Sequence, residues 1–248
     1  MTTIGPHDPR ARAAVTAIHA GRHDDLRSLL DEHPELATAR IGDDDPTGMS
    51  RTLLHVATDW PGHFPGVAST IGLLLAAGAE VDARFRGQHR ETALHWAASS
   101  GDLDALVALL DAGADIDADG GVIAGGTPLR DATAFGLQRA ARVLVDRGAS
   151  ATPFDLATLG MTDALVAALD ERDPSSRDDL DHAFWAACHG GRLDTAEVLA
   201  ARGADIDRLP AWEELTPLDA AARAGAHDVV RWLHGRGART SAELRDGV

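Results

Sequence analysis

Three side chains of the types that carry out acid–base chemistry stand near aromatic residues in this sequence. They are Asp59, Asp131 and His189. Carboxylates and imidazoles are the usual general acids and bases of enzymes, because they can hold or release a proton near neutral pH when their surroundings tune them. If the chain is an enzyme, these three residues are its catalytic candidates, and the expected chemistry needs no cofactor.

Nucleophilic catalysis has less support. Ser99 and Ser100 do not stand in the Gly-x-Ser-x-Gly pattern that presents a nucleophilic serine on a strained turn. Cys188 and His189 are neighbours in a predicted helix, so their side chains point about 100° apart and do not face each other. The sequence therefore holds no secure catalytic motif.

Metal binding is not expected either. The acidic run 43–45 reads as a solvated loop, because the spaced oxygen ligands of a calcium loop do not follow it. Asp59, His63 and His189 are a conceivable ligand set, but they come from parts of the chain that are far apart. Cysteine spacing of the zinc kind is absent, since the chain has one cysteine.

A wider set of candidate binding residues shares comparable positions along successive predicted helices, where aromatic and polar side chains replace small ones. The set is Asp59, Trp60, His63, Trp96, Ser99, Ser100, Arg130, Asp131, Phe135, Trp185 and His189. Two interpretations stay open. The bulky side chains fill gaps between irregular helices, or they line an apolar concavity with a few polar groups, as small-ligand sites do.

The elements that must position these residues are clearest in the stretch 91–118. Thr92 can cap a first helix, which Gly101 ends because glycine readily takes positive φ. Asp102 can cap a second helix, which ends at Gly113 and has apolar residues at helical spacing. Neither short helix can bury its apolar stripe alone, so the unit needs copies of itself on both sides.

Such copies follow one another along the chain. Thr-Leu-Leu-His begins at Thr52, Thr-Ala-Leu-His at Thr92, and Thr-Pro-Leu at Thr127 and Thr216. With this signature and a period near 33 residues, the chain resembles the ankyrin-repeat proteins. About seven copies are expected, at residues 11–40, 51–83, 91–118, 126–149, 151–171, 180–207 and 215–239.

The resemblance implies an all-α fold, an ankyrin-repeat α-solenoid of helix-turn-helix pairs with hairpin-like fingers and a concave groove. We expect a loose N-terminal tail at 1–10, a single repeat domain at 11–240 and a C-terminal tail at 241–248. The implied function is an interaction module that binds a partner protein through groove and fingers. The alternative is a cofactor-independent enzyme or small-molecule binder that uses an aromatic-lined concave pocket.

The histidine in this signature has a structural explanation. The residue three places after the threonine can bond back toward the cap, and His55, His95, Asp155 and Asp219 stand at that place. Arg130 occupies it in the fourth copy and cannot accept the return bond. We expect the four accepting residues to serve the caps, whereas Arg130 pairs with a neighbouring acid or is held for a ligand.

Local irregularities indicate where a working surface lies. The second copy has an insertion at 60–66 that carries aromatic residues, and 84–90 is a basic patch on an acidic protein. The glycine-rich stretch 119–126 precedes Thr127-Pro128 and lacks the Walker pattern, so we expect a finger there. We expect the surface to centre on copies two to four, with copy six completing it.

Composition limits the partners and the compartment. The 248 residues have a formal net charge of -16, which disfavours nucleic acid and suits a basic partner. No apolar run is long enough to span a membrane, and the single Cys188 suits a reducing cytoplasm. All 23 basic residues are Arg, and Lys, Asn and Tyr are missing, which is typical of a GC-rich bacterial genome. We expect a cytoplasmic monomer.

Overall fold

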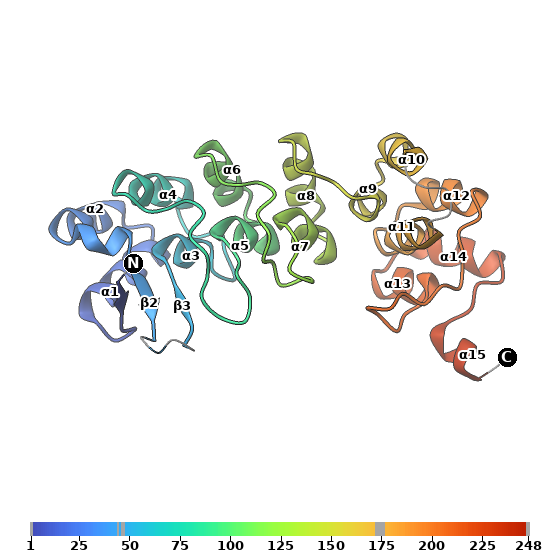
Figure 1. Ribbon diagram of the computed structural model, residues 1–248, viewed down its shortest axis with the longest axis horizontal. Coiled ribbons are helices and arrows are strands. Elements are labelled where there is room, and N and C mark those ends of the chain that lie inside the picture. The colour runs from blue at the N-terminus through green and yellow to red at the C-terminus, as the bar shows by residue number, and fades with distance from the viewer. Residues whose placement is uncertain (1, 44, 46–47, 172–176, 247–248) are drawn as a thin grey trace. The chain divides into compact units, whose positions relative to one another are not determined.

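The structure is a computed structural model that describes residues 2–43, 45, 48–171 and 177–246 (Figure 1). The chain forms two compact units, Met1–Ala149 and Ser150–Val248. The expected repeats from 11 to 149 lie in the first unit, and those from 151 to 239 lie in the second. Part of the acidic run 43–45 and part of the charged loop after Asp170 lie outside the described residues.

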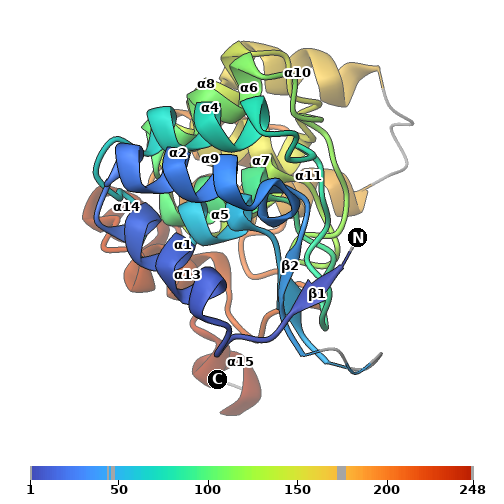
Figure 2. The same ribbon diagram turned by 90° about the vertical axis from the view of Figure 1, so that its left-hand side faces the viewer.

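The first unit is built from four successive helix pairs. The pairs are α1 (Pro9–His19) with α2 (His23–Glu32), α3 (Leu53–Thr58) with α4 (Val67–Ala76), α5 (Ala93–Ser100) with α6 (Leu103–Asp111), and α7 (Pro128–Ala134) with α8 (Gln138–Asp146). A short 3-10 helix, η1 (Pro34–Ala37), follows α2. Each first helix packs against the first helix of the next pair, and each second helix packs against the next second helix (Figures 1 and 2).

The second unit continues the same pattern. Its pairs are α9 (Pro153–Leu159) with α10 (Thr162–Asp170), α11 (Arg177–His189) with α12 (Leu193–Ala201), and α13 (Pro217–Arg223) with α14 (His227–Gly235); α15 (Ser241–Asp246) follows. The expected tail at 241–248 is thus helical over most of its length. Phe184 is the largest fully buried side chain of this unit, and the apolar core around it joins α9 to α14.

A small sheet at the start of the chain departs from the expected loose tail. β1 (Thr3–Ile4) pairs in parallel with β2 (Arg40–Gly42), and β2 pairs antiparallel with β3 (Ser50–Arg51) (Figure 2). Asp8 then caps α1 by accepting the backbone N–H of Arg10 at 2.8 Å. Thr3 and Ile4 are therefore held by strand pairing and by burial of the Ile4 side chain, and Asp8 is held by its role as a helix cap.

Local sequence signals explain where the helices begin and end. Capping boxes are present at Thr52, Thr92, Thr152 and Thr216, as the signature predicted. Gly101 ends α5 at φ +71°, and Asp102 caps α6 by accepting the N–H of Ala105 at 3.1 Å. The predicted all-α solenoid of repeated helix pairs is confirmed, with the three-stranded sheet as an addition.

The predicted finger at 119–126 also forms. Its chain turns back on itself through hydrogen bonds from Gly120 N–H to the Gly125 carbonyl and from Gly121 N–H to the Gly126 carbonyl, both 2.9 Å. A second finger, residues 85–91, is joined to it by a bond from Arg90 N–H to the Gly120 carbonyl. In the described part of the chain, no helix has both the length and the apolar character needed to cross a bilayer.

Candidate binding site

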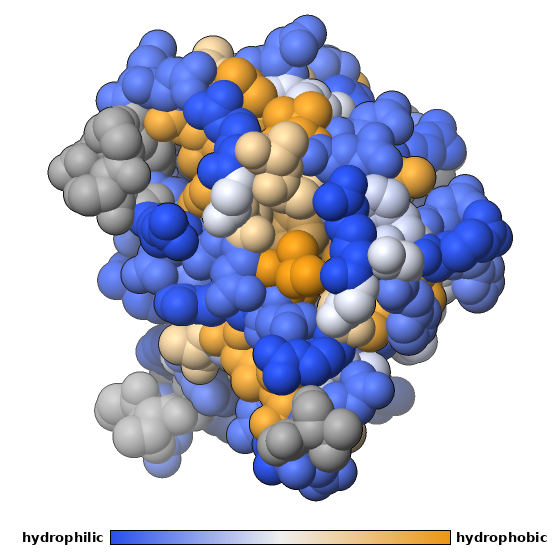
Figure 3. Space-filling view, turned by 90° about the vertical axis from the view of Figure 1, so that its right-hand side faces the viewer, coloured by the Kyte–Doolittle hydropathy of each residue, from blue (hydrophilic) through white to orange (hydrophobic). Residues whose placement is uncertain are grey.

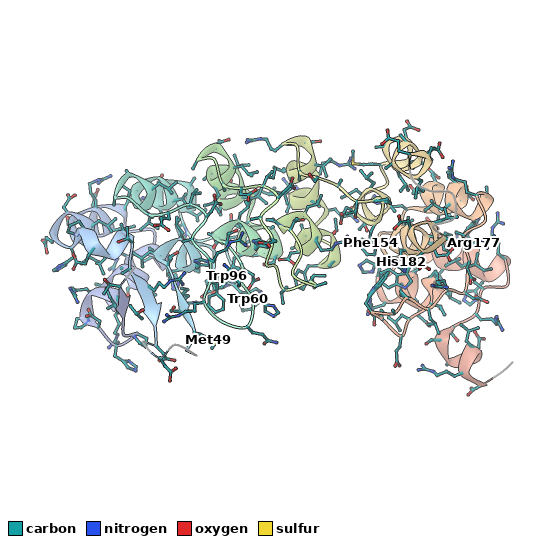
Figure 4. All side chains as sticks on the ribbon, viewed as in Figure 1. Met49, Trp60, Trp96, Phe154, Arg177 and His182 are labelled. Carbon is teal, nitrogen blue, oxygen red and sulfur yellow. The ribbon has the colours of Figure 1, made fainter. Side chains whose placement is uncertain are left out.

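Trp96 lies at the centre of an aromatic cluster in the first unit (Figure 4). Its ring on α5 is half-buried and meets His55 edge-on at 4.9 Å between ring centroids. Phe85 from the 85–91 finger packs on it at 5.5 Å. The indole is therefore oriented by one helix and one finger, while part of its surface stays accessible.

The two signature histidines next to this cluster are structural. His55 Nδ1 faces the Thr52 hydroxyl at 2.9 Å and its Nε2 lies 3.1 Å from the Glu91 carbonyl. His95 repeats this with Thr92 and the Gly126 carbonyl. Burial lowers the pKa of each imidazole to about 4, because the charged form would lose its hydration. The predicted capping role is confirmed, and each ring also anchors the finger that leads to the next pair.

Glu91 is a functional candidate that sequence analysis missed. Its half-buried carboxylate stands at the base of the 85–91 finger. Burial raises its pKa, while the nearby Trp96 side chain and the charge of His89 act in the opposite direction. A glutamate just before a helix cap looks ordinary in the sequence, and only the structure shows that its carbonyl accepts from His55 Nε2 at 3.1 Å and from the Phe85 N–H at 2.6 Å.

Asp131 is fully buried on α7, so it does not line an open surface. Its Oδ1 accepts the Ile123 N–H at 3.2 Å, and Oδ2 has no hydrogen-bond partner. Gly121 lies so close that an added Cβ would stand 2.7 Å from Oδ2. Burial, with a smaller effect from Glu91, raises the pKa of Asp131 to about 7, against the lowering effect of two finger amides. The carboxylate therefore fixes the 120–126 finger, while its ionised form lowers the stability of the fold because it is buried.

The inserted loop of the second copy contacts the helix pair before it and the helix pair after it. His63 N–H donates to the buried carboxylate of Asp102, and Phe64 stacks on His19 with ring centroids 4.3 Å apart. Asp59 pairs with Arg51 and accepts the Trp60 N–H at 3.0 Å. Trp60 itself is 82% exposed (Figure 4). The loop therefore exposes Trp60 to solvent, while its neighbours His63 and Phe64 are fixed by contacts with other elements.

The remaining candidates of the first unit lie on α5 and α7. Ser99 and Ser100 donate to carbonyls of their own helix, at 3.2 and 3.3 Å. Arg130 N–H bonds to the Thr127 hydroxyl at 3.4 Å, but α7 has no capping box, as the arginine at this place predicted. Phe135 caps the end of α7 and is half exposed.

Trp185 and His189 belong to the second unit and form a separate aromatic cluster. Trp185 is buried, donates its indole N–H to the Leu215 carbonyl at 2.9 Å, and stacks on His189 at 5.3 Å. Phe154 and Trp212 each approach Trp185 to about 6 Å between ring centroids, and His182 meets Trp212 at 4.4 Å. Figure 4 labels Phe154 and His182 in this unit. Three of these rings, those of Phe154, His182 and Trp212, were not among the predicted residues.

The three predicted acid–base residues have different environments. Asp59 pairs with Arg51, Asp131 supports a finger, and His189 stacks on Trp185. Burial raises the pKa of the neighbouring Cys188 thiol, which disfavours the reactive thiolate. Among the described residues, no group of three or more His, Cys, Asp or Glu is placed to hold a metal ion.

Exposed apolar side chains are confined to one part of the repeat. Within the described residues, the large apolar side chains that stand exposed are Met49, Trp60, Val122, Phe135, Leu209 and Trp212. All six lie in fingers or at the ends of first helices, and none lies on a second helix. Figure 3 shows how hydrophilic residues interrupt the apolar groups on one side of the molecule.

Two family models match parts of this chain. A family model described as ankyrin repeats (3 copies) matches residues 66–155, and another, ankyrin repeats (many copies), matches residues 184–234. The ankyrin repeat domain of human ASB11, a solved structure, is 26% identical; the match covers 76% of this chain and 85% of that one, with a TM-score of 0.44.

Two curated relatives carry the same repeats. The ankyrin repeat and KH domain-containing protein mask-1 of Caenorhabditis elegans is 29% identical over 68% of this chain. A protein of the same description from Caenorhabditis briggsae is 27% identical over 59% of it. The match spans only 6% of either relative's length. Because the two family models together cover more than half of its residues, the chain belongs to the ankyrin-repeat family.

Proposed function

We propose that this protein is an interaction module that binds a partner protein through the fingers and first helices of its first unit. Ankyrin repeats generally serve protein–protein interaction, and repeat stacks present extended surfaces for it. We call the surface made by α3, α5, α7 and the fingers between them the finger face.

The distribution of exposed apolar side chains carries this proposal. Exposed apolar residues that gather on one side of a protein mark a place where another molecule removes them from water. On the first unit, Met49 and Val122 are exposed in the finger regions, at 65% and 38%. The second helices, whose outer sides are the alternative surface, expose no large apolar side chain in the described residues.

The aromatic cluster supports the same surface. Trp96 is half-buried and fixed by His55 and Phe85, so little side-chain freedom is lost when a partner covers it. Tryptophan and arginine are enriched among the residues that dominate binding energies. We therefore assign Trp96 and Arg130, together with the finger residues, to the binding surface.

A capture experiment with paired variants tests the proposal. The protein is immobilised and exposed to an extract of the cells that encode it, beside the double variant Met49→Ser, Val122→Ser and the control Asp104→Ala on the exposed side of α6. We expect the parent and the Asp104→Ala control to capture the same partner protein from the extract, and the double variant to fail to capture it. Equal capture by the double variant, with loss in Asp104→Ala, would move the site to the second helices.

We also propose a cytoplasmic monomer. A single cysteine, Cys188, is buried, so the fold draws on no disulfide and suits a reducing compartment. Light scattering coupled to gel filtration tests the monomer: one chain has a mass of 26.0 kDa, and a concentration-independent dimer mass would contradict it.

A further inference from the structure

We propose that the aromatic cluster of the second unit binds a trimethylammonium group, the cation of choline and of trimethylated lysine. The cluster consists of Phe154 on α9, His182 and Trp185 on α11, and Trp212 in the link between α12 and α13. This site goes beyond the proposed function, because it belongs to the second unit and uses no residue of the finger face.

Three rings of the cluster are arranged as two nearly parallel rings and one crossing ring. Phe154 and Trp185 lie 6.2 Å apart between centroids at an interplanar angle of 23°. Trp212 crosses both of them at 6.1 Å, with angles of 75° and 81°. Because the three centroids are nearly equidistant, a cation about 4 Å outside their plane lies within about 6 Å of all three, the range in which aromatic rings attract cations.

The outer rings of the cluster are accessible, and Trp185 supports them. Trp212 is 52% exposed, Phe154 and His182 are half-buried, and Trp185 is 4% exposed. The indole N–H of Trp185 donates to the Leu215 carbonyl at 2.9 Å, and His182 meets Trp212 edge-on at 4.4 Å. A ligand would therefore contact three rings that other aromatic side chains already hold in place, so little side-chain freedom is lost on binding.

His182 contributes a neutral ring to this cluster. Burial lowers the pKa of its imidazole, and the charge of Arg208 acts in the same direction, while the charges of Asp178, Asp179 and Asp181 act against it. An imidazole with an ordinary pKa near 6.5 is already mostly neutral at pH 7, and a lowered pKa makes it more so. The ring therefore does not repel a bound cation.

The charges around the cluster favour a cation over an anion. Residues 177–214 contain nine acidic residues and four arginines. Asp178 and Asp179 stand four and three places before His182 on α11, so they lie one helical turn from the cluster. Arg177 stands five places before His182 and projects about 140° away from it around the helix. The arginine next to the cluster in sequence thus belongs to another side of α11.

The carboxylates beside the cluster already have cationic partners, and this selects the kind of cation. Asp178 pairs with Arg208 at 2.7 Å, and Glu213, the neighbour of Trp212, pairs with Arg223 at 3.0 Å. An ammonium or guanidinium group needs acceptors for its N–H groups when it leaves water, and these carboxylates are occupied. A trimethylammonium group has no N–H and needs only aromatic faces in a negative field.

Choline is the probe for this site, and 3,3-dimethylbutan-1-ol is its control, because this alcohol has nearly the same shape without the charge. Binding is followed by the indole N–H signals of Trp185 and Trp212 in nitrogen-15 NMR spectra, with the Trp212 signal assigned by its loss in Trp212→Leu. We expect a saturable shift with choline and at least about tenfold weaker binding of the alcohol, because the alcohol lacks the attraction between cation and ring.

Trp212→Leu is the matched variant, because leucine keeps an apolar side chain but has no aromatic face. We expect it to weaken choline binding about tenfold or more, with the Trp185 signal as the readout. Trp60→Leu, which changes the exposed tryptophan of the first unit, should leave binding unchanged. Unchanged NMR signals elsewhere show that Trp212→Leu is folded; if it is not, Phe154→Leu replaces it with the same expected direction.

A second pair of probes separates the two sources of the group. N-acetyl-trimethyllysine methylamide that binds more tightly than choline indicates a methylated side chain of a protein, and tighter binding of choline indicates a small molecule. The unmethylated lysine probe should bind at least about tenfold more weakly than its trimethylated form, because the ammonium group is strongly hydrated. Equal binding of the two lysine probes would overturn the choice of cation.

Equal binding of choline and the alcohol, no shift with either, or parent-like choline binding by Trp212→Leu would overturn the site. These results would leave the proposed function standing, because the capture experiment uses variants of the first unit and none of these probes.

Discussion

Three buried titratable groups make the free energy of unfolding of the first unit depend on pH, and they act in two opposite directions. The pKa of Asp131 is raised from 3.8 to about 7 in the folded chain. Below pH 3.8 the carboxyl is neutral in both states and does not destabilise the fold. The free energy of unfolding then falls as the pH rises from 3.8 through 7. His55 and His95 have folded pKa values lowered to about 4, so their contribution is complete above pH 6.5 and falls as the pH drops toward 4.

Asp131→Asn tests the first part. Asparagine can still accept the Ile123 N–H but cannot ionise, so we expect it to raise the free energy of unfolding at pH 8 by on the order of 1–4 kcal/mol. The gain should shrink toward pH 5, where the parent carboxyl is protonated. Urea unfolding at both pH values measures it; a variant less stable than the parent at pH 8 would show that the carboxylate is not strained.

His95→Gln tests the second part. Glutamine can accept at the cap but does not take up a proton, so stability should fall less steeply between pH 6.5 and 4 than in the parent. The slope of unfolding free energy against pH is the measurement, and His234→Gln on the exposed side of α14 is the control. A slope equal to that of the parent would mean that His95 is protonated in the fold.

At the scale of elements, the inserted loop of residues 59–66 and α6 share one carboxylate. Asp102 caps α6 through Oδ1 and accepts the His63 N–H through Oδ2. Other second helices, α8, α10, α12 and α14, begin without a side-chain cap. One residue therefore joins helix and loop.

Variants at Asp102 separate the two bonds. Asp102→Ala removes both and should cost roughly 1–3 kcal/mol of stability. Asp102→Asn keeps one accepting oxygen and should cost less. Hydrogen exchange should rise at 60–66 in both variants, but at the start of α6 only in Asp102→Ala. Unchanged exchange at 60–66 would contradict the proposed role of Asp102 in holding the loop.

Local signals made most elements predictable, because caps, glycine turns and apolar spacing act within a few residues. Thr92, Gly101 and Asp102 do what their types predicted. The pairing of Thr3 with Arg40 depends on contacts far apart in the chain, so the loose tail was predicted in its place. For the same reason Phe85 and Glu91 were missed: Phe85 contacts Trp96 and the Glu91 carbonyl contacts His55, and both partners lie on other elements.

For the whole molecule, stability should be modular, because each helix pair contacts mainly its neighbours. Leu109 on α6 is fully buried, and Leu109→Ala should cost roughly 2–5 kcal/mol through the cavity it leaves. The neighbouring Leu110 is only half-buried, so Leu110→Ala should cost less and is the matched control.

Hydrogen exchange locates this damage. In Leu109→Ala the protection of α4, α6 and α8 should fall first, and residues 150–246 should keep theirs, because they form a separate compact unit. An equal rise in exchange at both ends of the chain would contradict modular stability.

We propose above all that the finger face binds the partner protein. Isothermal titration of the captured protein against Trp96→Ala and Arg130→Ala, each first shown to be folded, tests it most directly. We predict a loss of roughly 1–3 kcal/mol in binding free energy for each, and no loss for Asp104→Ala. Parent-like binding by both variants, together with lost binding by Asp104→Ala, would contradict the claim.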